Sequence, residues 1–163
     1  MLSLVLAACA TKRTSQEAPL RTEIAPPTEA TAEQQPSQAQ MMIDTATSMI
    51  GQPYRFGGAA PGGFDCSGLV VYAAASAGIL VPRTAAEQLE FGSKVRRAEM
   101  QAGDLVFMHL SGKELHVAIA LDRQLFVHAP SSGGRVRVDS LLVPPYANGF
   151  IAARRVVSFP TPH

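Results

Sequence analysis

The sequence has few cysteines, no tryptophan and no large excess of charge of one sign. Its 163 residues contain only two Cys, which excludes a scaffold held by many disulfides and a zinc site built from four cysteines. A net charge of +1 gives no basic excess of the kind expected for nucleic-acid binding. With 47% hydrophobic residues, the chain can still bury a core, so it is not disordered throughout.

Aromatic residues are absent from the first third of the chain, since all seven Phe and three Tyr lie at Tyr54 or later. Residues 10–40 contain four Pro, and their only large hydrophobic side chains are Leu20 and Ile24. Such a segment cannot bury enough apolar surface to offset the entropy lost on ordering, so we expect a disordered tether at 10–40. The remaining residues, 41–159, are then long enough for one domain.

The first nine residues contain a short apolar run that ends at Cys9. The run is too short to span a bilayer but resembles the hydrophobic region of a secretory signal, although no Lys or Arg precedes it. Residues 6–9, Leu-Ala-Ala-Cys, match a bacterial lipobox, in which the Cys thiol is linked to diacylglycerol. Ala10, rather than Asp, follows Cys9, which resembles the outer-membrane sorting signal. We therefore expect a lipid-anchored protein on the outer membrane, facing the periplasm.

Hydrophobic spacing and turn residues predict an α+β fold in which helices come first and antiparallel strands follow. The predicted helices are 41–50, 66–77 and 85–91, and a Gly-rich loop covers 57–63. The predicted strands are 105–109, 116–121, 125–128, 136–138 and 150–157. These elements would form a sheet of about five strands.

Cys66 has the sequence surroundings of a nucleophile. Asp65 is a good N-cap, which places Cys66 in the first turn of the apolar helix that follows. There the free backbone N–H groups and the positive end of the helix dipole favour a thiolate and can also hold an oxyanion. The alternative is a small buried Cys that only packs within the helix.

A nucleophilic Cys requires a base, and His116 and His128 flank a predicted hairpin. If the loop at 122–124 has three residues, position 118 faces 128 and both His side chains lie on one face. A loop of two residues would place them on opposite faces. One His could then take the thiol proton and the other could orient it, while His109, at another strand end, competes for the role of base.

Several motifs together resemble the NlpC-type cell-wall cysteine peptidases. They are Gly-Gln-Pro-Tyr-Arg-Phe-Gly-Gly at 51–58, Gly-Phe-Asp-Cys-Ser-Gly-Leu-Val at 63–70, Val-Pro-Arg-Thr-Ala-Ala-Glu-Gln at 81–88, Gly-Asp-Leu-Val-Phe at 103–107, His-Val-Ala-Ile at 116–119 and Val-His-Ala-Pro at 127–130. They occur in the order and spacing of the family. Combined with the lipobox, they make the whole chain similar to the Spr/MepS-like group of murein endopeptidase lipoproteins.

The resemblance implies roles for individual residues. Cys66 corresponds to the nucleophile, His116 to the general base, His128 to the orienting third member and Tyr54 to the tyrosine at the oxyanion site. It favours His116 over His109, which lies outside the matched motifs. The implied fold is a reduced papain-like α+β unit in which the helix that carries the Cys packs on the antiparallel sheet, in agreement with the order of elements predicted from the residues.

The resemblance also implies a substrate. Family members cleave stem or cross-link peptides of peptidoglycan, often at D-glutamyl– or D-alanyl–diaminopimelate bonds. Because these peptides carry carboxylates, we expect Arg55 and Arg83 to be candidates for substrate binding, and Ser67 to shape the pocket. For either Arg, a solvated or structural role is the alternative.

No cofactor, metal or nucleic acid is expected from the sequence. Cys66, His116 and His128 could in principle ligate zinc, but the helix-start Cys and the family motifs favour a thiol peptidase. The alternative functions are a non-catalytic lipoprotein that binds murein or acts as a scaffold, and an amidase or acyltransferase acting on another amide. The expected partners are peptidoglycan peptides and, through Cys9, a membrane; the sequence leaves open whether an adaptor regulates the protein.

Overall fold

The computed structural model describes residues 36–110, 114–131 and 134–157. The helices are α1 (Gln38–Ser48), α2 (Cys66–Ser76), α3 (Ala85–Glu90), the 3-10 turn η1 (Arg97–Glu99) and α4 (Tyr146–Gly149). The strands are β1 (Ala59–Ala60), β2 (Gly63–Phe64), β3 (Ser93–Val95), β4 (Leu105–His109), β5 (Leu115–Ala120), β6 (Leu125–His128), β7 (Arg137–Ser140) and β8 (Phe150–Arg155). The predicted signal at 1–9, with its lipobox, lies outside the described residues, as does most of the predicted tether.

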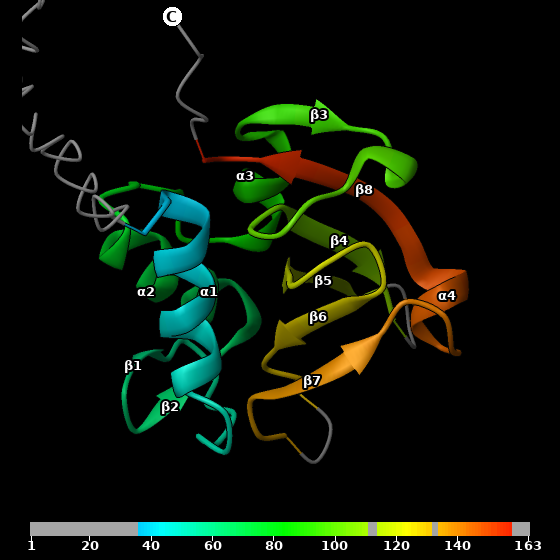
Figure 1. The fold of residues 1–163 in the computed structure, drawn as a ribbon. Coiled ribbons are helices and arrows are strands. Elements are labelled where there is room, and N and C mark those ends of the chain that lie inside the picture. Colours follow the sequence, from blue (N-terminus) through cyan, green and yellow to red (C-terminus); the bar gives the residue numbers. More distant parts are fainter. Residues whose placement is uncertain (1–35, 111–113, 132–133, 158–163) are drawn as a thin grey trace, which may run out of the picture. The chain divides into compact units, whose positions relative to one another are not determined.

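The main sheet has six described strands in the order β3-β8-β4-β5-β6-β7, and every neighbouring pair is antiparallel. Figure 1 shows α1 and α2 side by side next to this sheet, with α3 close to β8. The fold is therefore α+β with helices packed on an antiparallel sheet, which confirms the predicted class. The sheet exceeds the expected five strands because the short strand β3 was not predicted from the sequence.

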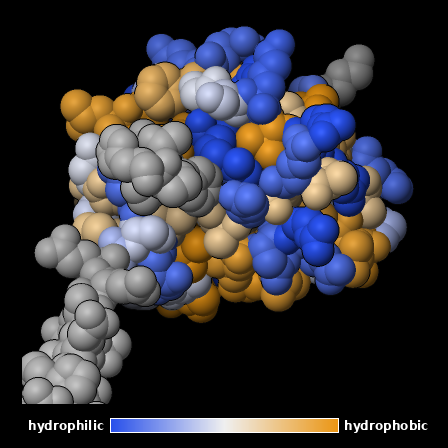
Figure 2. Space-filling view, turned by 45° about the horizontal axis from the view of Figure 1, so that its top comes forward, coloured by the Kyte–Doolittle hydropathy of each residue, from blue (hydrophilic) through white to orange (hydrophobic). Residues whose placement is uncertain are grey.

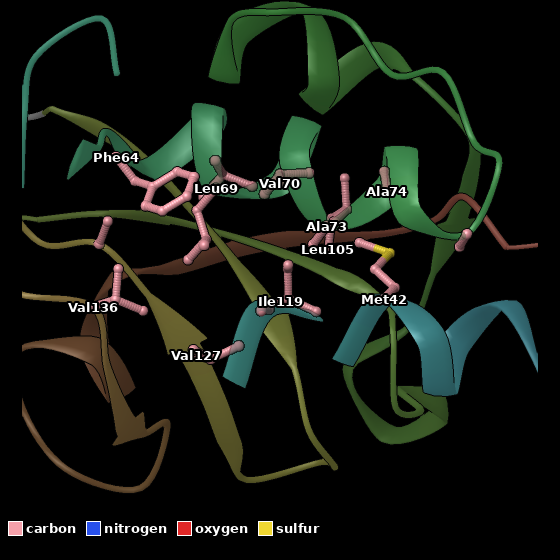
Figure 3. Close-up of a cluster of buried hydrophobic side chains, with 14 of the residues drawn as sticks. Met42, Phe64, Leu69, Val70, Ala73, Ala74, Leu105, Ile119, Val127 and Val136 are labelled. Carbon is pink, nitrogen blue, oxygen red and sulfur yellow. The ribbon is translucent and has the colours of Figure 1, made fainter. Parts of the chain in front are cut away.

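The main hydrophobic core lies between the helices and one face of the sheet. Figure 3 shows Met42 of α1 pointing toward the small residues Ala73 and Ala74 of α2, while Leu105 and Ile119 of the sheet meet α2 from below. All of these side chains are at most 1% exposed. Each large apolar side chain buried in this way contributes about 1.5–3 kcal/mol to stability. This core fixes α2 on the sheet and so fixes the position of its first residue, Cys66.

A second cluster covers the opposite face of the sheet. Its members come from β4, β5, β6 and β8, from α4 and from the residues that follow η1 and β7: Met100, Val106, Met108, Ala118, Ala120, Phe126, Leu141, Tyr146 and Ala153. Because successive residues of a strand point to opposite faces, His116 and His128 share this face with Ala118 and Phe126. The sheet therefore carries the catalytic histidine candidates on the side where α4 packs.

Local signals explain where the two long helices begin. The Ser37 hydroxyl accepts a hydrogen bond from the backbone N–H of Gln40 and caps α1, which begins three residues before the predicted position 41. Asp65 caps α2 as predicted, because its Oδ1 accepts the backbone N–H of Gly68 at 2.6 Å. Residues 38–40 thus belong to a helix, which corrects the prediction that they are part of the tether.

The exposed surface on the side shown in Figure 2 is mixed, with hydrophobic residues placed among hydrophilic ones. Within the described residues, no helix is both long and apolar enough to cross a membrane.

Candidate active site

Cys66 is the first residue of α2 and lies where the helix meets the beginning of β5. The backbone N–H groups of Ser67 and of Val117 in β5 lie close enough to its sulfur to act against a rise in the thiol pKa. The first contact comes from the open end of the helix, where backbone N–H groups lack intrahelical partners. The second places the thiol beside the residue that follows His116. The predicted nucleophile therefore lies beside the strand that carries the predicted base, next to the residue that follows it.

Asp65, Ser67 and Arg83 form a clamp around the first turn of α2. Arg83 donates to both carboxylate oxygens of Asp65, at 3.0 and 2.7 Å, and to the Ser67 hydroxyl at 3.0 Å. Asp65 also accepts the backbone N–H of Gly57 in the Gly-rich loop at 2.9 Å. Burial raises the pKa of Asp65, but the bonds from Arg83, Gly68 and Gly57 outweigh this and lower it overall. Asp65 is therefore ionised, and it ties the loop, α2 and Arg83 together.

A cavity of about 420 Å³ opens beside Cys66. Its lining comes from the Gly-rich loop, the start of α2, the start of α3 and the residue before β5: Tyr54, Phe56, Gly57, Asp65, Cys66, Ser67, Arg83, Thr84 and Glu114. The volume lies within the range usual for small-ligand sites. Four of the predicted site residues, Cys66, Tyr54, Ser67 and Arg83, thus line one cavity, and Phe56, 90% exposed at its rim, was not predicted.

The predicted thiolate is not the resting state of Cys66. Burial raises the pKa of the Cys66 thiol above its usual value, and the carboxylates of Asp65 and Glu114 raise it further. The N–H groups of Val117 and Ser67 act in the opposite direction but do not outweigh burial. The sequence shows the helix start and its dipole, whereas the desolvation that decides the outcome comes from tertiary packing. At neutral pH Cys66 is therefore a thiol.

The hairpin β5–β6 has the three-residue loop on which the histidine hypothesis depended. Ile119 pairs with Val127 and Ala120 with Phe126, so position 118 faces 128. Asp122 fixes the loop, since its Oδ1 accepts the backbone N–H groups of Gln124 and Leu125 at 2.6 and 2.8 Å. The prediction that both histidines lie on one face of the hairpin is thereby confirmed.

The two imidazoles form a direct hydrogen bond, with 2.8 Å between His116 Nε2 and His128 Nδ1. Their rings are nearly perpendicular, and both are almost fully buried. Since His116 Nε2 is engaged with His128, Nδ1 is the ring nitrogen of His116 that remains for the thiol. Among the described residues, neither imidazole makes a hydrogen bond to the Cys66 sulfur, as is common for catalytic pairs before substrate binds.

Sequence reasoning missed a carboxylate at the far end of this chain of contacts. His128 Nε2 lies 2.8 Å from Asp139 Oδ2, and Asp139 belongs to β7, the neighbour of β6 in Figure 1. The same oxygen accepts from Arg137 Nε at 2.7 Å and from the Tyr146 hydroxyl at 2.8 Å. The only sequence signal was an alternation of charged residues along one strand, which does not show which strand lies next to it.

Both buried histidines are neutral at physiological pH. Burial lowers the pKa of His116 to about 3, with the charges of His128 and Arg137 contributing. Burial also lowers the pKa of His128 to about 4, although the hydrogen bond to Asp139 acts to raise it. A neutral His116 can accept a proton, which is what a general base for a thiol requires.

The remaining predicted residues have distinct places. Burial raises the pKa of Tyr54, so its hydroxyl is protonated and able to donate into the cavity. Arg55 instead lines a neighbouring cavity of the Gly-rich loop, where it packs over Gly63. His109, the competing base, is exposed at the end of β4 and is not among the residues that line the Cys66 cavity.

Within 36–110, 114–131 and 134–157, no group of three or more His, Cys, Asp or Glu side chains could hold a metal ion.

Comparisons with known proteins agree with this geometry. Residues 51–155 match the NlpC/P60 family. The chain is 38% identical over 115 residues to the murein DD-endopeptidase MepH of Escherichia coli K12, covering 67% of this chain and 42% of MepH. It is 36% identical over 118 residues to the protein named murein DD-endopeptidase MepS/murein LD-carboxypeptidase of the same organism, covering 72% of this chain and 62% of the relative.

Solved structures show the same fold. The peptidoglycan hydrolase RipB of Mycobacterium tuberculosis superimposes with a TM-score of 0.65 at 32% identity, covering 75% of this chain and 66% of RipB. A Bacillus cereus structure described as an NlpC/P60 family protein gives a TM-score of 0.70 at 31% identity, covering 76% of this chain and 42% of that one. Among the relatives compared by sequence, the chain spans less than two thirds of the length of MepH and of MepS.

Proposed function

Because the chain belongs to the NlpC/P60 family, we propose that it is a cysteine peptidase that hydrolyses peptide bonds in peptidoglycan, with Cys66 as nucleophile and His116 as general base. The observation that carries this proposal is the position of the Cys66 thiol beside Val117 of β5, the residue that follows His116, whose imidazole is hydrogen-bonded to that of His128. The names of MepH, MepS and RipB, which refer to murein or peptidoglycan, support the substrate class.

The resting protonation states define the first step. Between the low pKa values of the histidines and the raised pKa of the thiol, the proton resides on sulfur and both imidazoles are neutral. As Sγ of Cys66 attacks the substrate carbonyl carbon, Nδ1 of His116 accepts the thiol proton. A C–S bond forms, and the carbonyl π electrons move to oxygen. Proton transfer coupled to attack avoids a free thiolate in a site that disfavours one.

The oxyanion that forms needs donors already in place. Among the residues that line the cavity, Cys66 at the start of α2 offers its backbone N–H and Tyr54 offers its protonated hydroxyl. Collapse of the tetrahedral species breaks the C–N bond, and His116 returns the proton to the departing amine. His116 then accepts a proton from water as the water oxygen attacks the thioester carbon. The C–S bond breaks, His116 returns the proton to the sulfur, and the acid product leaves.

For the bond that is cleaved, we propose the D-alanyl–diaminopimelate cross-link rather than the D-glutamyl–diaminopimelate bond. The printed names of MepH and MepS both specify a DD-endopeptidase. Arg83 supplies a cation at the cavity, with a side chain 40% exposed, and could meet a substrate carboxylate without leaving Asp65. Arg55 lies in the neighbouring cavity, which makes it the weaker candidate of the two for that contact.

The test is digestion of isolated sacculi and of a purified cross-linked muropeptide dimer by the full chain, with the products identified by mass spectrometry. Conversion of the dimer to monomers ending in D-alanine supports the proposed bond. Cleavage after D-glutamate would contradict that choice but retain the enzyme class. Binding to sacculi without any product would instead favour the scaffold function.

We also propose that Cys9 carries a lipid that holds the protein on the outer membrane, facing the periplasm. The Leu-Ala-Ala-Cys sequence at 6–9 and the polar composition of 10–40 support this proposal. Cys9→Ser should move the protein from the membrane fraction to the soluble periplasmic fraction, whereas Cys66→Ser should leave it on the membrane. Retention of the Cys9→Ser protein on the membrane would contradict the proposal.

A further inference from the structure

Asp139 ends a chain of hydrogen bonds that runs through both imidazoles. The chain passes from Asp139 Oδ2 to His128 Nε2, and from His128 Nδ1 to His116 Nε2, with each separation at 2.8 Å. Asp139 is not among the residues that line the cavity beside Cys66. Any effect it has on the reaction must therefore act through the histidines.

Two further side chains hold the Asp139 carboxylate in one orientation. Arg137 Nε and the Tyr146 hydroxyl both donate to Oδ2, at 2.7 and 2.8 Å, and Arg137 also reaches the Tyr146 oxygen at 3.1 Å. Burial raises the pKa of Asp139, but the bonds from Arg137, Tyr146 and His128 outweigh it and lower the pKa overall. Asp139 is therefore ionised at neutral pH, and an ionised carboxylate can only accept hydrogen bonds.

Because Asp139 only accepts hydrogen bonds, it determines which ring nitrogen of each histidine carries the proton. If Asp139 only accepts, His128 Nε2 must carry the hydrogen, and neutral His128 then has a lone pair on Nδ1. That lone pair can only be met by an N–H on Nε2 of His116. Neutral His116 is left with its lone pair on Nδ1. The reverse tautomers would place a hydrogen on Nδ1 of His116, where the thiol proton has to arrive.

We propose that Asp139, held by Arg137 and Tyr146, is a positioning residue that fixes both histidines as Nε2–H tautomers and so keeps the Nδ1 lone pair of His116 available to Cys66. The proposal deepens the proposed peptidase function and rests on it for its kinetic consequence. The tautomers themselves are properties of the resting protein and can be measured without any substrate.

The first measurement is the tautomeric state of the ring nitrogens in protein labelled with ¹⁵N-histidine, read from long-range ¹H–¹⁵N NMR spectra at neutral pH. In the wild-type chain, His116 and His128 should both show a protonated Nε2 and an unprotonated Nδ1. In Asp139→Ala, both rings should acquire a measurable fraction of the Nδ1–H form, because nothing accepts from His128 Nε2. Asp44→Ala, which removes an exposed carboxylate of α1, is the matched control and should leave the spectrum unchanged.

The second measurement is the rate of cleavage of a muropeptide dimer. Asp139→Ala should lower kcat by about 10²-fold, the lower end of what a general base contributes, with little change in KM, because Asp139 does not line the cavity. Asp139→Asn, which keeps an oxygen at the same place, should recover part of kcat. Tyr146→Phe, which removes one of the three donors to Asp139, should cause a smaller loss than Asp139→Ala.

Folding is checked by urea denaturation, and Asp139→Asn and Tyr146→Phe test the proposal if Asp139→Ala does not fold. A folded Asp139→Ala protein with unchanged tautomers and unchanged kcat would overturn the proposal. This is the result expected if Asp139 only makes a structural contact between β7 and α4. If the wild-type chain cleaves no muropeptide, the proposed function fails, and the NMR experiment still decides whether Asp139 sets the tautomers.

Discussion

At the scale of single residues, the protonation state of the Cys66 sulfur decides how the site must work. Burial and the neighbouring carboxylate of Asp65 hold the thiol protonated, while burial also keeps both histidines neutral. A preformed thiolate–imidazolium pair is therefore disfavoured before substrate arrives. The base has to act during the attack, which makes the position of the His116 lone pair more important than the resting nucleophilicity of the thiol.

Asp65→Asn should lower the pKa of Cys66. An Asn side chain can still cap α2, but the substitution removes the negative charge that raises the thiol pKa. The rate of alkylation by iodoacetamide, followed against pH, should rise at a lower pH in Asp65→Asn than in the wild-type chain. In the wild-type chain the rate should keep rising above the ordinary thiol pKa of about 8.5.

Asp44→Asn is the control for this experiment, because it removes an exposed charge from α1 and should leave the profile unchanged. A wild-type alkylation profile with its midpoint well below pH 8 would contradict the raised thiol pKa. It would instead support the resting thiolate that the helix dipole alone predicts.

The sequence predicted which residues form the candidate site but not their ionisation. Cys66, His116 and His128 could be predicted because each lies at the end of a predicted helix or strand. The sequence left open whether both histidines share one face, and the pairing of β5 with β6 decides this. The raised pKa of Cys66 could not be predicted from the sequence, because desolvation depends on which residues far away in sequence pack around the thiol. Asp139 was missed for a related reason: its importance depends on β7 pairing with β6.

At the scale of elements, the first turn of α2 is held unusually close to the Gly-rich loop. A Cβ at Gly68 would lie 2.0 Å from the carbonyl oxygen of Gly58 and 2.9 Å from Asp65 Oδ1. Gly58 itself accepts the backbone N–H of Asp65 at 3.0 Å, so the loop and the cap of α2 form one rigid unit. Glycine is required there by this close approach, since its place inside a helix would otherwise favour Ala.

Gly68→Ala should therefore destabilise the protein, although helix propensity alone predicts a gain of about 1 kcal/mol. The overpacked Cβ should cost about 1–3 kcal/mol in the free energy of unfolding and should lower peptidase activity by displacing the turn that carries Cys66. Urea denaturation measures the first effect and muropeptide turnover the second.

Ala75→Gly provides the matched comparison at an exposed position of the same helix. It should lose about 1 kcal/mol through propensity and keep its activity. A Gly68→Ala protein that is more stable than the wild-type chain would show that the loop can move away from α2 at little cost.

Elements with strong sequence signals were predicted more accurately than short ones. Strands 105–109 and 125–128 agree with β4 and β6, and the helix expected at 66–77 ends one residue earlier, at Ser76. The two-residue strand β1 lies within the predicted Gly-rich loop, and β2 begins at its last residue. Neither hydrophobic alternation nor length gives a signal there. The turn of α4 at Tyr146–Gly149 was also missed, being a single turn that follows two prolines.

At the scale of the whole molecule, burying two neutral histidines makes stability depend on pH. Their pKa values are about 3 and 4 in the folded protein, against an ordinary value of 6.5. Between pH 6.5 and 4 the unfolded chain therefore binds protons that the folded protein does not. Stability must fall as pH falls through this window, by up to about 1.4 kcal/mol per pH unit for each histidine.

The expected result is a free energy of unfolding that decreases from pH 7 to pH 5, measured by urea denaturation at each pH. Asp65 and Asp139 have lowered pKa values, so their contributions are lost only below about pH 3.8 and do not obscure this window. His128→Asn should reduce the slope, and His109→Gln, at an exposed position, should retain it. A stability that stays flat between pH 7 and 5 would contradict the assignment of neutral buried imidazoles.

The central claim is that the sulfur of Cys66 performs the attack on a peptide bond of peptidoglycan. The most direct measurement is the turnover of a purified cross-linked muropeptide dimer by Cys66→Ala, in protein shown to be folded by urea denaturation. The account predicts no detectable monomer from this variant under conditions in which the wild-type chain converts the dimer completely. Monomer release by Cys66→Ala at a rate near that of the wild-type chain would contradict it.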